Sequence, residues 1–190
     1  MQALRTKLSE GYDRFWDGLL GIDSAGADCR PTAYRVLRRV FAALPLAAHD
    51  HFVDIGCGRG RVLCLAALQP VARAVGVEIN AVHAALARQN LAGLRGRRTG
   101  TWGVTTGSAA EFDLSGGTVF YMFNPFGGAL FSEVATHIGR AIAKGGKPAR
   151  VVYVNPVCRD VLDGADWLAE PEVMYRDRDG KAAALLYRSR

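Results

Sequence analysis

From His51 onward, short apolar runs alternate with longer segments of helical periodicity. This alternation constrains the fold more than any other feature, because it is typical of strand and helix units that build a parallel sheet covered by helices. The apolar runs predict strands at 51–55, 73–78, 102–106, 117–123 and 149–154. The periodic segments predict helices between them at 61–69, 81–92 and 127–143.

The first thirty residues predict an accessory helical segment. Apolar residues recur there at three- and four-residue steps, as in an amphipathic helix, at Leu4, Leu8, Tyr12, Phe15 and Leu19. We expect this helix to pack on the core, with a lid over a substrate pocket as the alternative role of residues 1–30. A second helix is predicted from Pro31 to Pro45, with an apolar stripe at Val36, Leu37, Val40, Phe41 and Leu44.

The last part of the chain predicts a closing hairpin. Asp179-Gly180, a dipeptide favoured in tight turns, separates the runs 167–176 and 181–188. The expected fold is therefore α/β, with a seven-stranded, mostly parallel, doubly wound sheet, a C-terminal antiparallel hairpin and N-terminal accessory helices. A length of 190 residues with 49% hydrophobic content suits one core, so we expect a single domain over 1–190.

A glycine-rich loop ends the first predicted strand and begins the first helix after it. It reads Asp54-Ile55-Gly56-Cys57-Gly58-Arg59-Gly60. Glycines allow a tight turn and a close approach of the backbone to a ligand, and the helix start offers unpaired N–H groups. The next strand ends in Glu78, where a carboxylate can accept hydrogen bonds from ribose hydroxyls. A nucleotide-like cofactor is indicated.

Two families share this layout, and Arg61 separates them. Dinucleotide dehydrogenases have a third glycine where Arg61 stands, and this chain also lacks an obvious Tyr-Lys or His catalytic pairing. An acidic residue two positions before the first glycine resembles the class I S-adenosylmethionine-dependent methyltransferases. The resemblance implies that Asp54 and the backbone of the loop face the methionine moiety, and that Glu78 holds the ribose. The implied cofactor-binding residues of this part are Asp54, Gly56, Cys57, Gly58, Gly60 and Glu78.

The methyltransferase family usually contacts adenine after the third strand. Here that place holds Ser108 and Ala109, where many relatives have an acidic residue. The resemblance implies that the Ser108 hydroxyl or a backbone group contacts the base, with Glu111 as an alternative partner.

The motif Asn124-Pro125-Phe126 ends the fourth predicted strand, where the reactive methyl group of the family lies. It resembles the Asn-Pro-Pro-aromatic tetrapeptide of enzymes that methylate amino or amide nitrogens, with one proline missing. The resemblance implies that Asn124 orients the acceptor nitrogen, Pro125 holds the turn and Phe126 supplies an aromatic face. An ordinary strand end followed by an Asn-Pro turn is the structural alternative.

These features predict a methyltransferase that transfers a methyl group to a nitrogen of a protein, at lysine or amide, or of a nucleic acid. An NAD(P)-dependent oxidoreductase and a non-catalytic S-adenosylmethionine-binding module are the alternatives. The net charge of +6 permits a polyanionic partner, and seven arginines lie between Arg59 and Arg98 against the single acid Glu78. This span favours nucleic acid only if its arginines share the face that contains Asn124. If the arginines scatter, a protein or a small substrate is favoured.

The remaining composition predicts a reduced, cytoplasmic protein without a membrane partner. The four cysteines form no close pair, and no apolar run reaches the length that spans a membrane. The first twenty residues mix charges with apolar residues, unlike a secretory signal. His49 and His51 flank Asp50, but His83 and His137 lie far off in sequence and no further ligand is close by, so no metal site is predicted.

Overall fold

The computed structural model describes residues 2–24 and 29–190, with side chains from Glu10 onward in the first range. The helices are α1 (Gln2–Leu20), α2 (Tyr34–Ala43), α3 (Arg61–Ala67), α4 (Ala81–Gly93), α5 (Gly128–Gly145) and α6 (Arg159–Asp163). The strands are β1 (His51–Ile55), β2 (Arg73–Glu78), β3 (Thr101–Thr106), β4 (Val119–Phe123), β5 (Arg150–Val154), β6 (Glu172–Arg176) and β7 (Ala182–Arg188).

All seven strands form one sheet in the order β3-β2-β1-β4-β5-β7-β6. The five strands from β3 to β5 are parallel, and β7 runs antiparallel to both β5 and β6. This arrangement confirms the predicted α/β fold with its C-terminal hairpin. At the hairpin turn Gly180 has a positive φ of 77°, which explains the glycine there.

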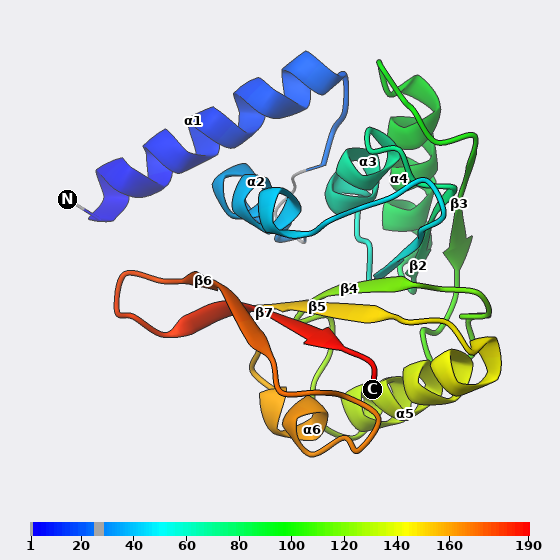
Figure 1. Cartoon of the computed structure of the whole chain (residues 1–190). Coiled ribbons are helices and arrows are strands. Elements are labelled where there is room, and N and C mark those ends of the chain that lie inside the picture. The colour runs from blue at the N-terminus through cyan, green and yellow to red at the C-terminus, as the bar shows by residue number, and fades with distance from the viewer. Residues whose placement is uncertain (1, 25–28) are drawn as a thin grey trace.

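Helices cover both faces of the sheet, as Figure 1 shows with α2, α3 and α4 on one side and α5 and α6 on the other. Residues of each strand point alternately into the two cores, because successive side chains of a strand face opposite ways. In β4, Val119 and Tyr121 enter the core beneath α2 and α3, whereas Phe120 and Met122 enter the core beneath α5. Among the described helices, none is long and apolar enough to cross a membrane.

The topology places a binding edge beside β1. Strand β1 lies between β2 and β4, so the chain leaves the sheet in opposite directions on either side of it. In open α/β sheets, ligands bind at the carboxyl ends of the strands at such a reversal. The loop after β1 is held there, since the N–H groups of Gly56 and Cys57 both donate to the carbonyl of Val77.

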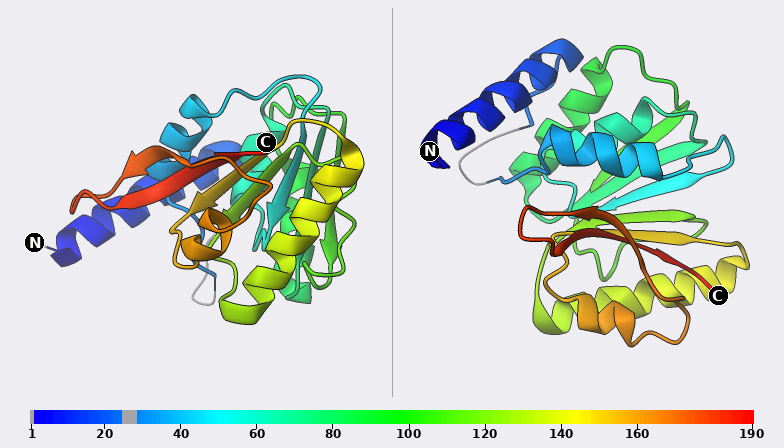
Figure 2. Two further views of the ribbon diagram at one scale, coloured as in Figure 1. Left: turned by 60° about the horizontal axis from the view of Figure 1, so that its bottom comes forward. Right: turned by 60° about the vertical axis from the view of Figure 1, so that its left-hand side comes forward.

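Helix α1 is present as predicted, but its expected contact face is wrong. Phe15 is 64% and Leu19 54% exposed, while Asp17 and Leu20 are buried. The side chains of Leu4 and Leu8 lie outside the described residues. The helix turns a partly polar side to the domain, because a buried arginine described below binds its aspartates. Figure 2 shows the N-terminal end of α1 projecting from the same side of the molecule as the β6–β7 turn.

Candidate functional site

The glycine loop after β1 adopts a backbone that requires glycine. Gly56, Gly58 and Gly60 have φ values of 73°, 54° and 82°, in the left-handed region. A Cβ on Gly56 would lie 2.6 Å from the Cβ of Pro125, so the loop packs directly on the segment after β4. Gly60 precedes α3 as its N-cap. The local sequence thus brings the ends of β1 and β4 into close contact.

Glu78 is fixed at the end of β2, facing this loop. The Gly58 N–H donates to one carboxylate oxygen at 2.8 Å, and the Asn80 N–H donates to the other at 2.8 Å. The side chain of Asn80 caps α4 by accepting from the N–H groups of Val82 and His83. Each Glu78 oxygen keeps a lone pair, so the carboxylate can accept hydrogen bonds from a ligand hydroxyl.

Asp54 is buried with one carboxylate oxygen unsatisfied. Among the described residues, none donates a hydrogen bond to its Oδ2. Burial, reinforced by the nearby charge of Glu78 and partly offset by the Leu63 N–H, raises the pKa of Asp54 to about 8. A buried acceptor without a donor is costly, and a bound ligand that carries a donor would remove this cost. The site therefore fits a cofactor with a cationic or N–H group at this point.

Two adjoining cavities lie along the carboxyl edge and share Gly56, Glu78 and Pro125. The first measures about 240 Å³ and contains the predicted residues Asp54, Gly56, Cys57, Gly58 and Glu78. The second measures about 170 Å³ and contains Ser108 and Ala109 among the apolar walls Val77, Ile79, Phe126 and Leu130. The structure thus brings the predicted cofactor residues together, except that Gly60 lines neither cavity and acts as the cap of α3.

Ser108 has a structural contact of its own. Its hydroxyl accepts a hydrogen bond from the Ala110 N–H at 3.2 Å, which shapes the turn after β3. The hydroxyl proton remains available to donate to a ligand. Glu111 is exposed and does not line the second cavity.

The motif after β4 lies where the two cavities meet. Pro125 lines both cavities and Phe126 lines the second. Asn124 is half-buried, lines neither cavity and has a positive φ of 38°. Asparagine tolerates this conformation better than other residues with a side chain, so the turn explains its presence in part.

The N-terminal segment supplies a wall of the first cavity that the sequence motifs did not predict. Its contribution is Cys29, Arg30, Pro31 and Thr32. The hydroxyls of Thr32 and Tyr121 are 2.9 Å apart and hydrogen-bonded, which ties the segment to β4. His83, Tyr121 and Phe123 also line this cavity. No local pattern marks these residues, because they come from separate parts of the chain.

Arg61 is the residue that holds the N-terminal segment in place. It is buried, and its guanidinium donates to Asp13 and Asp17 at 2.9 Å each and to the Ser24 hydroxyl at 2.7 Å. The guanidinium also lies 4.5 Å from the centre of the Tyr34 ring. Arg61, which stands where dinucleotide dehydrogenases have a third glycine, therefore anchors the N-terminal segment to α3 in this chain.

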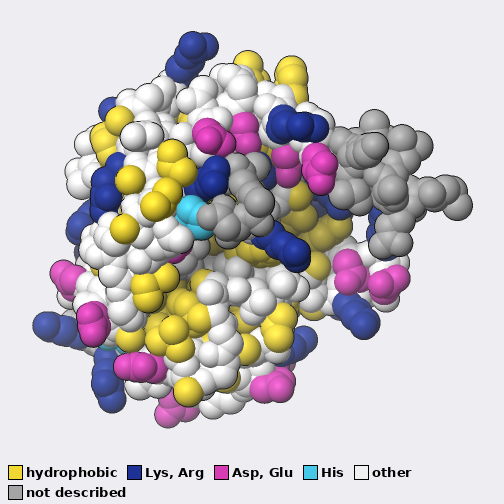
Figure 3. All heavy atoms as spheres, turned by 180° about the vertical axis from the view of Figure 1, so that it is seen from behind, with side chains coloured by type: hydrophobic (Ala, Val, Ile, Leu, Met, Phe, Trp, Pro, Cys, Tyr) yellow, Lys and Arg dark blue, Asp and Glu magenta, His cyan; other side chains and the backbone are white. Residues whose placement is uncertain are grey.

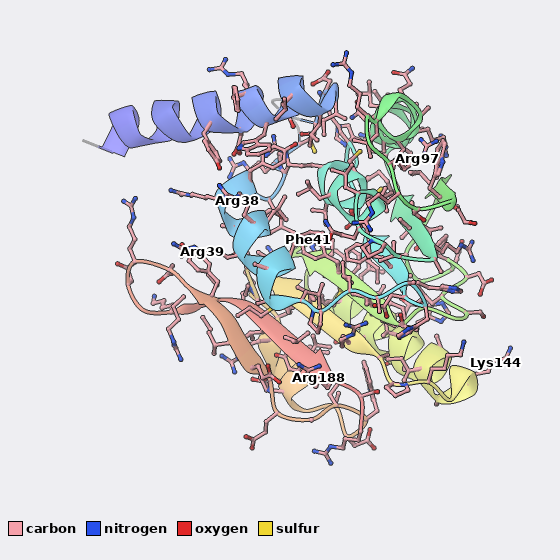
Figure 4. The ribbon with its side chains drawn as sticks, turned by 45° about the horizontal axis from the view of Figure 1, so that its top comes forward. Arg38, Arg39, Phe41, Arg97, Lys144 and Arg188 are labelled. Carbon is pink, nitrogen blue, oxygen red and sulfur yellow. The ribbon has the colours of Figure 1, made fainter. Side chains whose placement is uncertain are left out.

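The arginines between Arg59 and Arg98 scatter over the molecule. Arg61 is buried, and Arg59 lies 3.7 Å from Asp23. Arg88 bonds to β3, and Arg97 lies over the Trp102 ring at the start of that strand. Figure 4 shows Arg97 beside α4, and Figure 3 shows basic side chains dispersed among acidic ones on the rear face.

Comparisons with known proteins agree with this geometry. A family model described as histone methylation protein DOT1 matches residues 31–117. A protein-lysine N-methyltransferase of Saccharolobus islandicus is 38% identical over 96 residues, which cover 49% of this chain and 57% of the relative. The matched part thus spans little more than half of that relative.

Solved structures share the fold at low sequence identity. An RNA methyltransferase of Salinibacter ruber in complex with S-adenosyl-L-homocysteine has a TM-score of 0.59 and 21% identity, covering 84% of this chain and 92% of that one. A precorrin-6y C5,15-methyltransferase of Geobacter metallireducens has a TM-score of 0.61 and 17% identity, with coverages of 88% and 94%. The seven-stranded sheet and these solved structures give the chain the fold of the class I S-adenosylmethionine-dependent methyltransferases, and about half of its length is similar in sequence to methyltransferases that act on histone or on protein lysine.

Proposed function

We propose that this chain binds S-adenosylmethionine along the two adjoining cavities and transfers its methyl group to the side-chain nitrogen of a lysine in a protein. The observation that supports cofactor binding best is the unsatisfied, buried carboxylate oxygen of Asp54 beside the glycine loop. The cofactor carries a cationic amino group that can pair with this oxygen. S-adenosylmethionine combines this amino group with a ribose that can bind Glu78 and with an adenine ring that can lie between the apolar walls of the second cavity.

The proposed cofactor contacts follow the two cavities. Asp54, Cys57 and the backbone of Gly56, Gly58 and Gly60 form the methionine side, with Gly60 acting through the start of α3. Glu78 accepts hydrogen bonds from the ribose hydroxyls at the junction. Ser108 and Ala109 contact adenine between apolar walls. When bound, the cofactor supplies an electrophilic methyl group on a sulfonium centre.

The proposed acceptor site is the motif Asn124-Pro125-Phe126. Asn124 orients the nitrogen, Pro125 fixes the turn against Gly56, and Phe126 offers an aromatic face to the lysine stem. Lysine must lose a proton before it attacks, and desolvation at the cavity mouth lowers the pKa of an ammonium group. The choice of a protein lysine is supported by the Saccharolobus relative and by the scattered arginines.

We further propose that residues 1–30 form an accessory segment of a single domain over 1–190 and cover the cofactor. Support comes from Cys29 and Arg30, which line the first cavity, and from the Arg61 anchor. We also propose a reducing, cytoplasmic setting for this activity, supported by the four cysteines, which form no disulfide among the described residues.

Two measurements test the proposal. Calorimetric titration with S-adenosylmethionine, S-adenosylhomocysteine and NAD, on the native chain and Glu78→Ala, tests the cofactor. We expect binding of the first two ligands, at least about tenfold weaker in the variant because two ribose hydrogen bonds are lost. Binding of NAD alone would show instead a dinucleotide-dependent enzyme.

The acceptor is tested by the transfer of a tritiated methyl group from S-adenosylmethionine. Poly-L-lysine is the expected acceptor. Poly-L-arginine, transfer RNA and duplex DNA are assayed separately as alternative acceptors. Dimethylated poly-L-lysine is the matched control. Label in RNA or DNA without label in poly-L-lysine would refute lysine as the acceptor, while cofactor binding without transfer to any acceptor would favour a non-catalytic module.

A further inference from the structure

A second Asn-Pro dipeptide lies beside the first at the same edge of the sheet. Asn155-Pro156 follows β5 directly, as Asn124-Pro125 follows β4. The two strands are parallel neighbours with Phe123 opposite Val154, so the two asparagines occupy the next position of adjacent strands. Adjacent strands lie about 4.8 Å apart, so the two asparagines begin neighbouring turns at the carboxyl edge of the sheet.

Both asparagines have a strained backbone. Their φ values of 38° and 50° are the only positive ones among the non-glycine residues that the structure describes. A residue before proline prefers an extended backbone, and a residue with a side chain rarely adopts the left-handed region. The conformation of both asparagines is therefore unusual for two separate reasons. Strain of this kind persists where the surrounding structure imposes it, and it concentrates at functional sites.

The surroundings of Asn155 hold its backbone firmly. Its N–H donates to the Ala183 carbonyl of β7 at 2.9 Å, and its carbonyl accepts from the Val157 N–H at 2.9 Å. The Cys158 N–H donates to the Tyr153 hydroxyl at 3.1 Å. The side-chain amides of Asn124 and Asn155 have no hydrogen bond to another described residue, and Asn155 is exposed. A firmly held turn thus presents a side-chain amide that forms no hydrogen bond with the part of the chain that the structure describes.

We propose that Asn155 is a second positioning residue for the methyl acceptor, paired with Asn124; this inference rests on the lysine methyltransferase function proposed above. A neutral lysine amine has two N–H bonds and one lone pair. If the two amide oxygens each accept one N–H, the lone pair points away from both, toward the methyl group. The new N–C bond then forms as the C–S bond breaks with its electron pair passing to sulfur, and the methylammonium product gives one proton to water.

The choice of amides over carboxylates fits this chemistry. Two carboxylates would stabilise the ammonium form and raise the pKa of the lysine, which would suppress its attack. Two neutral acceptors orient the amine without holding its extra proton. Asparagine also meets the backbone requirement of both turns better than other polar residues do.

The pair has a consequence for the number of methyl groups transferred. A neutral monomethyl-lysine has only one N–H, so it can satisfy only one of the two amides. The first methylation therefore gains a hydrogen bond that the second lacks. The arrangement favours monomethylation, and Asn155 matters most for the unmethylated substrate.

The experiment compares two acceptors and two variants. The acceptors are a single-lysine peptide and the same peptide with monomethyl-lysine. Asn155→Gly removes the amide but keeps the left-handed backbone, Asn155→Ala removes the amide and strains the turn, and Val157→Ala is the control on the same exposed loop. Calorimetry with S-adenosylhomocysteine shows whether each variant keeps its cofactor site.

We expect Asn155→Gly to lower kcat/KM for the unmethylated peptide about tenfold, because one oriented hydrogen bond is lost. For the monomethyl peptide, we expect kcat/KM to fall less than about threefold. Cofactor binding should stay unchanged. Equal losses for both peptides, or no loss, would overturn the role of Asn155 while leaving lysine methylation intact. No transfer by the native chain to either peptide, despite cofactor binding, would overturn the proposed function and this inference together.

Discussion

Asp54 occupies a position where its burial and its charge oppose each other. It lies at the end of a buried strand, 2% exposed, with an acidic neighbour in Glu78. The free protein tolerates this by holding the carboxyl group protonated over much of the neutral range, since its pKa is raised from 3.8 to about 8. Binding of a cationic ligand at this carboxylate, as proposed above, would therefore be linked to its ionisation.

This linkage predicts a pH-dependent stability. A folded-state pKa above the unfolded value means that Asp54 stabilises the fold fully below about pH 4 and that this contribution is lost as the pH rises through about 8. The Asp54→Asn variant cannot ionise at this position, so its free energy of unfolding does not fall for this reason as the pH rises. Between pH 5 and pH 8, the ligand-free native chain should lose at least about 2 kcal/mol of unfolding free energy relative to the variant. Urea unfolding at both pH values checks this, and parallel profiles of the two proteins would contradict it.

Gly56 gives a second prediction at the scale of single residues. An alanine there would adopt a φ of 73° and place its Cβ 2.6 Å from the Cβ of Pro125. We expect Gly56→Ala to cost about 2 kcal/mol or more and to weaken S-adenosylhomocysteine binding at least about tenfold. Gly100→Ala, where the Cβ would meet open space, is the matched control. Similar calorimetric and urea-unfolding results for the two variants would exclude this explanation of the loop.

The sequence predicts the position of the glycine loop and of Glu78, because these residues are neighbours along the chain or lie at fixed spacing. Asp54, the glycines and Glu78 belong to one strand-loop-helix-strand unit, whose geometry is local. Arg61 and Asn155 escaped prediction for different reasons. The partners of Arg61 lie in α1 and the loop after it, whereas Asn155 repeats an Asn-Pro signal that gains meaning only when β4 and β5 are known to be neighbours.

At the scale of elements, the anchor between α1 and α3 is the least expected feature. The Asp17 carboxylate accepts from the guanidinium of Arg61, the hydroxyl of Tyr34 and the hydroxyl of Ser24. The Arg61–Asp17 ion pair is buried and Asp13 is half-buried, so removing the arginine would leave Asp17 without its cationic partner in a poorly hydrated place. Helix α1 is therefore tied to α3 by side chains of opposite charge, in addition to the apolar contacts of Trp16 and Leu20.

Arg61→Ala is therefore expected to destabilise the protein by about 3–5 kcal/mol and to release α1 first. Amide hydrogen exchange of residues 10–24 should rise more than that of β1 and β4. Arg95→Ala, an exposed arginine in the loop between α4 and β3, should leave both measurements within experimental error. Unchanged exchange in α1 of the Arg61 variant would show that apolar contacts hold the helix.

The elements themselves were predicted with unequal success. The five parallel strands and helices α3, α4 and α5 agree with the predicted ranges to within a few residues, because buried strands and amphipathic helices have distinct periodicities. Helix α6 was not predicted, since its single turn is too short to show a period. The contact face of α1 was wrong because periodicity counts apolar residues and cannot show that a buried arginine attracts the polar side.

At the scale of the whole molecule, cofactor binding should raise thermal stability. A ligand at one hundred times its dissociation constant adds about 2.7 kcal/mol, and a chain of this size gains roughly 2–4 °C in Tm for each kcal/mol. S-adenosylhomocysteine should therefore raise the Tm by about 5–10 °C. Glu78→Ala should show a much smaller rise at the same concentration, and NAD should give none in either protein. An equal rise in Tm for Glu78→Ala would show that Glu78 does not contribute to cofactor binding.

The anchor at Arg61 also has a consequence for how the chain is made. Asp13 and Asp17 precede Arg61 by 48 and 44 positions, so both aspartates leave the ribosome well before their partner does. Until then their carboxylates must stay hydrated, and α1 has no site on which to dock. Helix α1 thus joins the fold only after β1 and α3 have emerged, and the wall that it supports around the first cavity has to wait for the same event.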